Sequence, residues 1–103
     1  MIVYEVNLFV QRRIEAEYRA WLAGHVREIL ALPGFVGAEI FERVEPESGP
    51  DEFVLCTHYR LEDADALADY FAHHAPRLRA EGIRRFGDGF RAERRVLRSI
   101  GNY

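Results

Sequence analysis

Lysine is absent from this 103-residue sequence, and all 14 of its basic residues are arginine. A chain without lysine cannot form a Schiff base with a carbonyl substrate, and it cannot hold a nucleotide phosphate with a P-loop lysine. Cysteine is nearly absent too: the single Cys56 excludes an internal disulfide and any metal site built from several cysteines. Together, these gaps exclude several reaction classes without selecting one.

Long apolar runs are also missing, since no stretch approaches the roughly 20 residues that a membrane-spanning helix needs. The first ten residues, MIVYEVNLFV, carry an acid where a signal peptide carries basic charge, so we expect no signal peptide and a cytoplasmic protein. The net charge of −3 argues against nucleic acid or an anionic membrane as a dedicated partner. The length and balanced composition predict one folded domain over residues 1–103.

The hydrophobic period changes several times along the chain. Alternation predicts strands over 1–10, 35–45, 53–61 and 90–100, and a helical period predicts helices over 13–32 and 62–75. Pro76 is expected to end or kink the second helix and to restart a turn. The order βαββαβ predicts a ferredoxin-like α+β fold, with a four-stranded antiparallel sheet and two helices on one face. Right-handed crossovers place the first strand between the third and the fourth.

Splitting each strand by its period of two divides the sheet into two faces. The more apolar face, assigned to the helices, includes Val36 and four polar residues, Tyr4, Thr57, Tyr59 and Arg94. The other face includes Phe35 and mixes apolar side chains with charged ones, a composition typical of a subunit interface. We therefore predict a homodimer that packs sheet against sheet, the alternative being a monomer with an amphiphilic open face.

Four stretches carry a resemblance: MIVYEV at the start, WLAGHVREIL in the first helix, HHAPRLR in the second, and RFGDGFRAERRVL near the end. Through them nearly the whole chain resembles the dimeric α/β barrel superfamily, and more closely a bacterial family of about this length known as a domain of unknown function. The resemblance implies the fold and the dimer, and no reaction. The wider superfamily includes cofactor-independent monooxygenases, haem-degrading oxygenases, lactone isomerases and stress-responsive proteins.

A pocket is predicted between the helices and the sheet. Trp21 and His25 lie one turn apart on the apolar stripe of the first helix, so both should face the strands. An apolar cavity with a few convergent polar groups is the usual form of a small-ligand site. We assign catalytic roles to His25 (general base), Tyr59 (donor to an oxyanion) and Arg94 (anion binding), and ligand contacts to Tyr4, Trp21 and His74. The expected ligand is a small anionic or aromatic molecule, with a cofactor-independent oxygenase or isomerase as the possible activity.

Arg94 decides between this interpretation and a second one, because a buried guanidinium must be paired. Its candidate partners are Glu42, backbone carbonyls, or an anionic group on a ligand. If the partner is internal, the polar groups only satisfy one another and the chain is a non-catalytic structural or interaction module. His25 would then be a hydrogen-bonded core residue, and His74 would cap or bridge a broken helix.

No metal and no cofactor is predicted from the histidine pattern. His73 and His74 are adjacent and point apart on a helix, and no carboxylate stands four residues after His25 or His74. The resemblance makes haem conceivable, since an asparagine on the first strand takes part in some haem-degrading members. Asn7 matches that asparagine, but its parity places it on the face away from His25. Cys56 falls on the same face and is not expected to act as a nucleophile.

Overall fold

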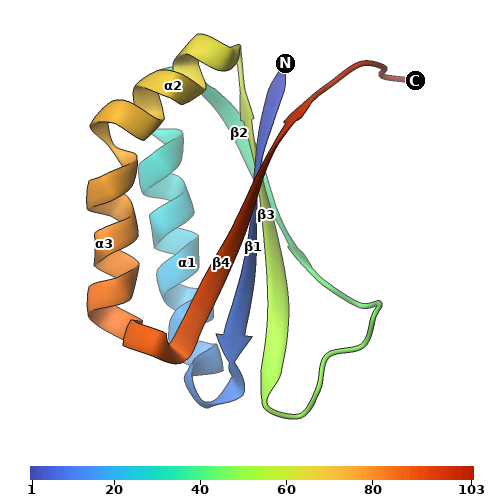
Figure 1. The fold of residues 1–103 in the computed structure, drawn as a ribbon, viewed down its shortest axis with the longest axis vertical. Coiled ribbons are helices and arrows are strands. Elements are labelled where there is room, and N and C mark those ends of the chain that lie inside the picture. Colours follow the sequence, from blue (N-terminus) through green and yellow to red (C-terminus); the bar gives the residue numbers. More distant parts are fainter.

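The computed structural model describes residues 1–103 in full. The elements along the chain are β1 (Ile2–Gln11), α1 (Glu15–Leu30), β2 (Phe35–Glu42), β3 (Glu52–Leu61), α2 (Ala64–His73), α3 (Ala75–Phe86) and β4 (Phe90–Arg98), with short 3-10 helices η1 (Arg12–Ile14) and η2 (Gly87–Gly89). The strands form one antiparallel sheet in the order β2-β3-β1-β4, and all the helices lie on one side of it (Figure 1). The predicted ferredoxin-like α+β architecture is confirmed.

Strand β1 occupies the centre of the sheet, where it pairs with β3 on one side and β4 on the other. The alternation in its sequence becomes an alternation in burial, because side chains at every second position point to the same face. The helix-facing residues of β1 and β3 are all buried: Ile2, Tyr4, Val6, Leu8, Val10, Phe53, Leu55, Thr57, Tyr59 and Leu61. The apolar core therefore lies between this face and the helices.

Strand β2 departs from strict alternation near its start. Its register against β3 shifts between Phe35 and Gly37, which marks a β-bulge or similar irregularity. The Phe35 ring consequently packs edge-on against Tyr59 and Tyr70, while Val36 is exposed. The prediction that Val36 faces the helices and Phe35 faces away is wrong. An extra residue in one strand moves the side chains that precede it to the opposite face of the sheet.

The second helical segment is divided into two helices. Helix α2 ends at His73 and α3 begins at Ala75, with Pro76 in its first turn. The intervening His74 has φ −130° and ψ −38°, outside regular helical geometry. Proline is tolerated at a helix start, where its missing N–H has no intrahelical partner. The break at Pro76 was expected, but α3 continues for 12 residues rather than for one turn. None of these helices has both the length and the hydropathy to cross a membrane.

Asp63 caps helix α2, its carboxylate accepting a hydrogen bond from the Ala66 N–H at 2.9 Å. Asp63→Ala removes this acceptor, so the free energy of unfolding should fall by about 1 kcal/mol. Asp63→Asn keeps an oxygen at the same place and should retain most of the stability. Urea unfolding of the three proteins measures both effects, and an alanine variant as stable as the parent chain would contradict the capping role.

The sheet side opposite the helices is not covered by any element (Figure 1). We call it the open face; it consists of Val3, Glu5, Asn7 and Phe9 of β1 together with their cross-strand neighbours in β3 and β4 and the residues of β2 on the same side. The β2–β3 loop and the C-terminal segment extend beyond the sheet on this side, one at each end (Figure 1). Several apolar side chains here are partly or fully exposed, including Phe41, Leu97 and, in the C-terminal segment, Ile100.

Candidate functional site

A cavity of about 240 Å³ lies between the helices and the helix-facing side of the sheet. Side chains from α1, α2, α3, β1, β3 and β4 line it, and most of them are hydrophobic. Its volume is slightly below the range of roughly 300 to 1,000 Å³ that is usual for ligand sites, so it suits a compact molecule. It is the larger of the two cavities found in the chain, and the other, at the β2–β3 loop, is mostly polar.

Trp21 and His25 form the helical wall of this cavity. Their rings stack with centroids 4.5 Å apart and planes inclined by 20°, as expected for aromatic residues one turn apart. Gly82 of α3 makes room for the indole, because a Cβ at that position would lie 3.0 Å from Trp21 Cη2. No sequence pattern distinguishes this glycine, since only the packing of α3 on α1 gives it a role.

His25 is suited to accept a proton. Burial lowers the pKa of its imidazole below the ordinary value of 6.5, so the ring is neutral at pH 7. Its Nδ1 is buried and has no hydrogen-bond partner within the chain. Buried polar atoms without a partner are rare in folded proteins and call for an explanation, such as a ligand or a bound water.

The sheet supplies the opposite wall through Tyr4, Thr57 and Tyr59. The Tyr4 and Tyr59 rings stack with centroids 5.8 Å apart. Burial raises the pKa of Tyr59, which keeps its hydroxyl protonated and therefore a hydrogen-bond donor. Thr57 Oγ1 is a second buried atom without a partner. Two of the three unpartnered buried side-chain atoms of the chain, on Thr57 and His25, thus belong to residues that line one cavity.

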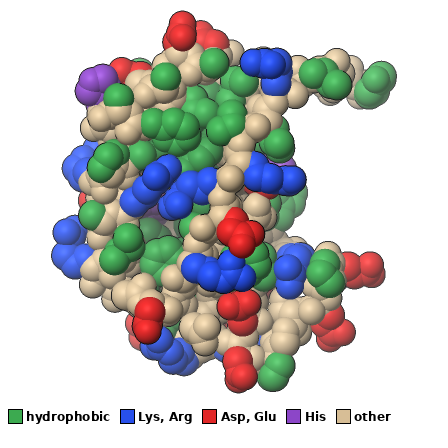
Figure 2. All heavy atoms as spheres, in the orientation of Figure 1, with side chains coloured by type: hydrophobic (Ala, Val, Ile, Leu, Met, Phe, Trp, Pro, Cys, Tyr) green, Lys and Arg blue, Asp and Glu red, His purple; other side chains and the backbone are tan.

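The charge of the lining is one-sided, because it includes Arg79, Arg91 and Arg94 and no aspartate or glutamate. Figure 2 shows basic side chains gathered between α3 and β4, beside exposed hydrophobic atoms. Arg91 is engaged elsewhere, with Glu93 and over the ring of Phe9. Arg79 donates only to the Tyr4 hydroxyl, at 3.1 Å. The lining therefore contains a guanidinium group that is free to bind an anion.

Arg94 forms no ion pair. Its predicted internal partner, Glu42, is bound instead by Arg19 of α1. The Glu42 alternative is therefore wrong: α1 passes above β2 and brings its own arginine to the end of that strand. Arg94 itself is largely exposed at the cavity mouth rather than fully buried, which explains how it persists without a carboxylate.

Five of the six proposed site residues line the cavity: Tyr4, Trp21, His25, Tyr59 and Arg94. The sixth, His74, does not, because the helix is interrupted at this residue and the apolar stripe does not continue through it. Its Nδ1 lies 3.3 Å from Arg77 Nη2. Asn7 lies on the open face, where it donates a hydrogen bond to Glu5 at 2.8 Å. It therefore cannot touch a group held in the cavity, and the haem role that the resemblance implies for it does not fit this chain.

A family model described as "Domain of unknown function (DUF4286)" matches residues 1–100. No curated protein matches the chain. The fold is similar to that of SnoaB from Streptomyces nogalater, a cofactor-independent oxygenase (19% identity, TM-score 0.67, covering 98% of this chain and 95% of that one). A putative antibiotic biosynthesis monooxygenase from Deinococcus radiodurans is also similar, at 12% identity and a TM-score of 0.73 (100% and 96% covered). So is a mutant of MhuD with two manganese protoporphyrin IX molecules per active site, at 17% identity and a TM-score of 0.65 (98% and 97% covered). At these identities the likeness is one of fold.

Proposed function

We propose a function from the chemistry of the cavity. The chain belongs to the family described as a domain of unknown function (DUF4286). The chain binds a compact, anionic, enolisable aromatic molecule between the helices and the sheet. The composition of the cavity lining carries this proposal. The lining is mostly apolar, it contains arginines and no acid, and two of its residues have buried polar atoms without a partner. Such a lining favours a ligand that brings both a flat apolar body and a negative group.

Proton abstraction is the chemistry that this arrangement supports best. His25 would take a proton from a CH₂ next to a carbonyl, while Arg94 and the Tyr59 hydroxyl stabilise the enolate oxygen. In an oxygenase, the resulting carbanion gives an electron to O₂, the two radicals combine, and the hydroperoxide loses water. The CH₂ and O₂ then become C=O and H₂O, so atoms and electrons balance without a cofactor. If the proton instead returns to another atom, the same site is an isomerase.

The functional unit is proposed to be a homodimer joined through the open face. This face leaves Phe41 and Leu97 exposed between two projecting segments, and no element of the same chain covers it. A second copy, related by two-fold symmetry, would bury these side chains and place the two cavities on opposite outer sides.

Phenylpyruvate tests the binding step, because it is compact, aromatic, enolisable and anionic, whereas phenylacetone lacks only the carboxylate. Phenylpyruvate should bind, and at 100 times its Kd it should stabilise the protein by about 2.7 kcal/mol. Phenylacetone should bind more weakly. No thermal shift with phenylpyruvate or other aromatic carboxylates would instead support the non-catalytic interaction module.

Arg94→Met should weaken phenylpyruvate binding by about 10- to 100-fold, because a charge-assisted hydrogen bond contributes roughly 1.5 to 3 kcal/mol. Arg84→Met is the matched control: Arg84 is exposed on α3 and does not line the cavity. Isothermal titration calorimetry compares the three proteins. Equal losses in the two variants would assign the effect to net charge alone and would contradict a role for Arg94.

A further inference from the structure

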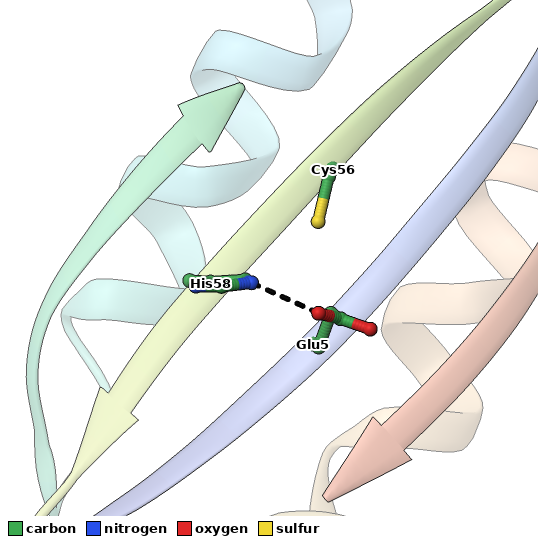
Figure 3. Close-up of side chains that lie close together, drawn as sticks. All are labelled: Glu5, Cys56 and His58. Carbon is green, nitrogen blue, oxygen red and sulfur yellow. Dashed lines mark hydrogen bonds and ion pairs between the residues drawn. The ribbon is translucent and has the colours of Figure 1, made fainter. Parts of the chain in front are cut away.

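Three side chains with metal-binding atoms meet on the open face, away from the cavity (Figure 3). Glu5 of β1 lies directly opposite His58 of β3 in the antiparallel register. Cys56 precedes His58 by two residues, so the period of the strand places it on the same face. The carboxylate oxygen, the thiol sulfur and the imidazole nitrogen all lie within 4.8 Å of one another. The two central strands of the sheet thus hold three different donor types together.

The distance between Glu5 and His58 suits a shared cation. His58 Nε2 lies 3.0 Å from Glu5 Oε1, a separation now bridged by a hydrogen bond (Figure 3). Zinc bonds to imidazole nitrogen and carboxylate oxygen measure about 2.0 to 2.2 Å, so one ion can bridge two such atoms after a small adjustment. The ion would take the place of the bridging proton. Glu5 is only 4% exposed, and it is therefore held at this position.

We propose that Glu5, Cys56 and His58 bind one divalent cation of the zinc type. Imidazole, thiolate and carboxylate are the ligands that Zn²⁺ takes in proteins, whereas Mg²⁺ and Ca²⁺ prefer sets made of oxygen alone. Three protein ligands leave the fourth tetrahedral position to water or another donor. The proposal does not depend on the cavity, because these side chains project from the opposite side of the sheet.

Arg95 is the main competitor for this site. Its guanidinium donates to both oxygens of Glu5, with the Nη2–Oε1 distance at 3.0 Å. A cation that binds Glu5 must displace these hydrogen bonds, and Asn7 donates to Oε2 as well, at 2.8 Å. Arg95 lies on β4, an edge strand of the sheet, and its side chain is 65% exposed in the single chain, so it can turn toward the edge of the sheet when a cation binds. Glu5 has no such freedom.

Cys56 supplies the sulfur donor of the set. It lies two residues before His58 on the same face, and a cation that binds its sulfur displaces the thiol proton, because only the thiolate is a ligand.

Co²⁺ and Zn²⁺ titrations of the full chain, after treatment with a chelator, test the proposal. One ion should bind per chain, and Co²⁺ should produce the near-ultraviolet charge-transfer absorption of a thiolate ligand. Cys56→Ala should abolish that absorption, and His58→Gln should weaken Zn²⁺ binding by at least about tenfold. His73→Gln is the matched control, because His73 is exposed on α2. Absence of the thiolate band, or equal losses in His58→Gln and His73→Gln, would overturn the proposal.

Arg95→Met separates a metal site from a simple ion-pair cluster. If Arg95 competes with the cation, its removal should tighten Zn²⁺ binding while it lowers the stability of the metal-free protein. If the cluster serves only as an ion pair, the variant should lose stability and gain no affinity for Zn²⁺, which contradicts the proposal. Circular dichroism confirms that each variant is folded before it is titrated.

Discussion

Replacing His25 with glutamine should lower kcat for phenylpyruvate by about 10²- to 10⁴-fold, the range that a general base contributes. Glutamine keeps much of the volume and a hydrogen-bonding group beside Trp21, but it cannot accept a proton. Binding should change little, because Arg94 and the apolar walls remain. Enol absorbance and an oxygen electrode follow the two possible reactions, and oxygen uptake distinguishes the oxygenase from the isomerase. His73→Gln is the control, and an unchanged kcat in His25→Gln would remove this residue from the mechanism.

The pH dependence of the same reaction is a second test of His25 as the general base. The base works in its neutral form, and burial holds its pKa below 6.5. The rate should therefore rise with pH through that lowered pKa and then level off before neutrality. Stability follows the same direction: the unfolded chain binds the proton more readily, so the contribution of His25 is present above pH 6.5 and is lost as the pH falls through the folded-state pKa. The His25→Gln variant should lack both dependences.

Much of the cavity could be predicted from the sequence, because strand parity and helix period fix which side chains face each other. The alternation of β1 placed Tyr4 toward the helices, and the same rule placed Tyr59 and Arg94. These assignments need only that the strands be regular. They do not require knowledge of the register, since all the helices lie on one side of the sheet.

Features that depend on register or on local irregularity were missed or wrong. The period of two along each strand puts Glu5, Cys56 and His58 on one face, but only the pairing of β1 with β3 shows that they meet. The irregularity at the start of β2 reversed Phe35, and the helix break removed His74 from the cavity. A partner choice such as that of Arg19 for Glu42 depends on where a helix passes over the sheet, which periodicity does not encode.

Placing an aspartate at Leu97 should dissociate the proposed dimer. Leu97 lies on the open face opposite Val3, and its side chain is partly exposed in a single chain. In a two-fold interface every substitution occurs twice, so a loss of about 2 kcal/mol per copy weakens association by roughly a thousandfold. Phe41→Asp should act in the same way from β2, where the ring packs against His58.

Ile83→Asp is the matched control for the oligomeric state of these two variants, because Ile83 is an exposed aliphatic residue on α3 that lines the cavity, on the side of the sheet away from the open face. Its oligomeric state should equal that of the parent protein. Sedimentation velocity over a range of concentrations measures the three variants. A parent chain that sediments as a monomer at all concentrations, or a dimer that survives both open-face substitutions, would show that this side of the sheet does not bind a second copy. Since each cavity opens on the helical side, an intact monomeric variant should still bind phenylpyruvate, which separates the dimer proposal from the ligand proposal.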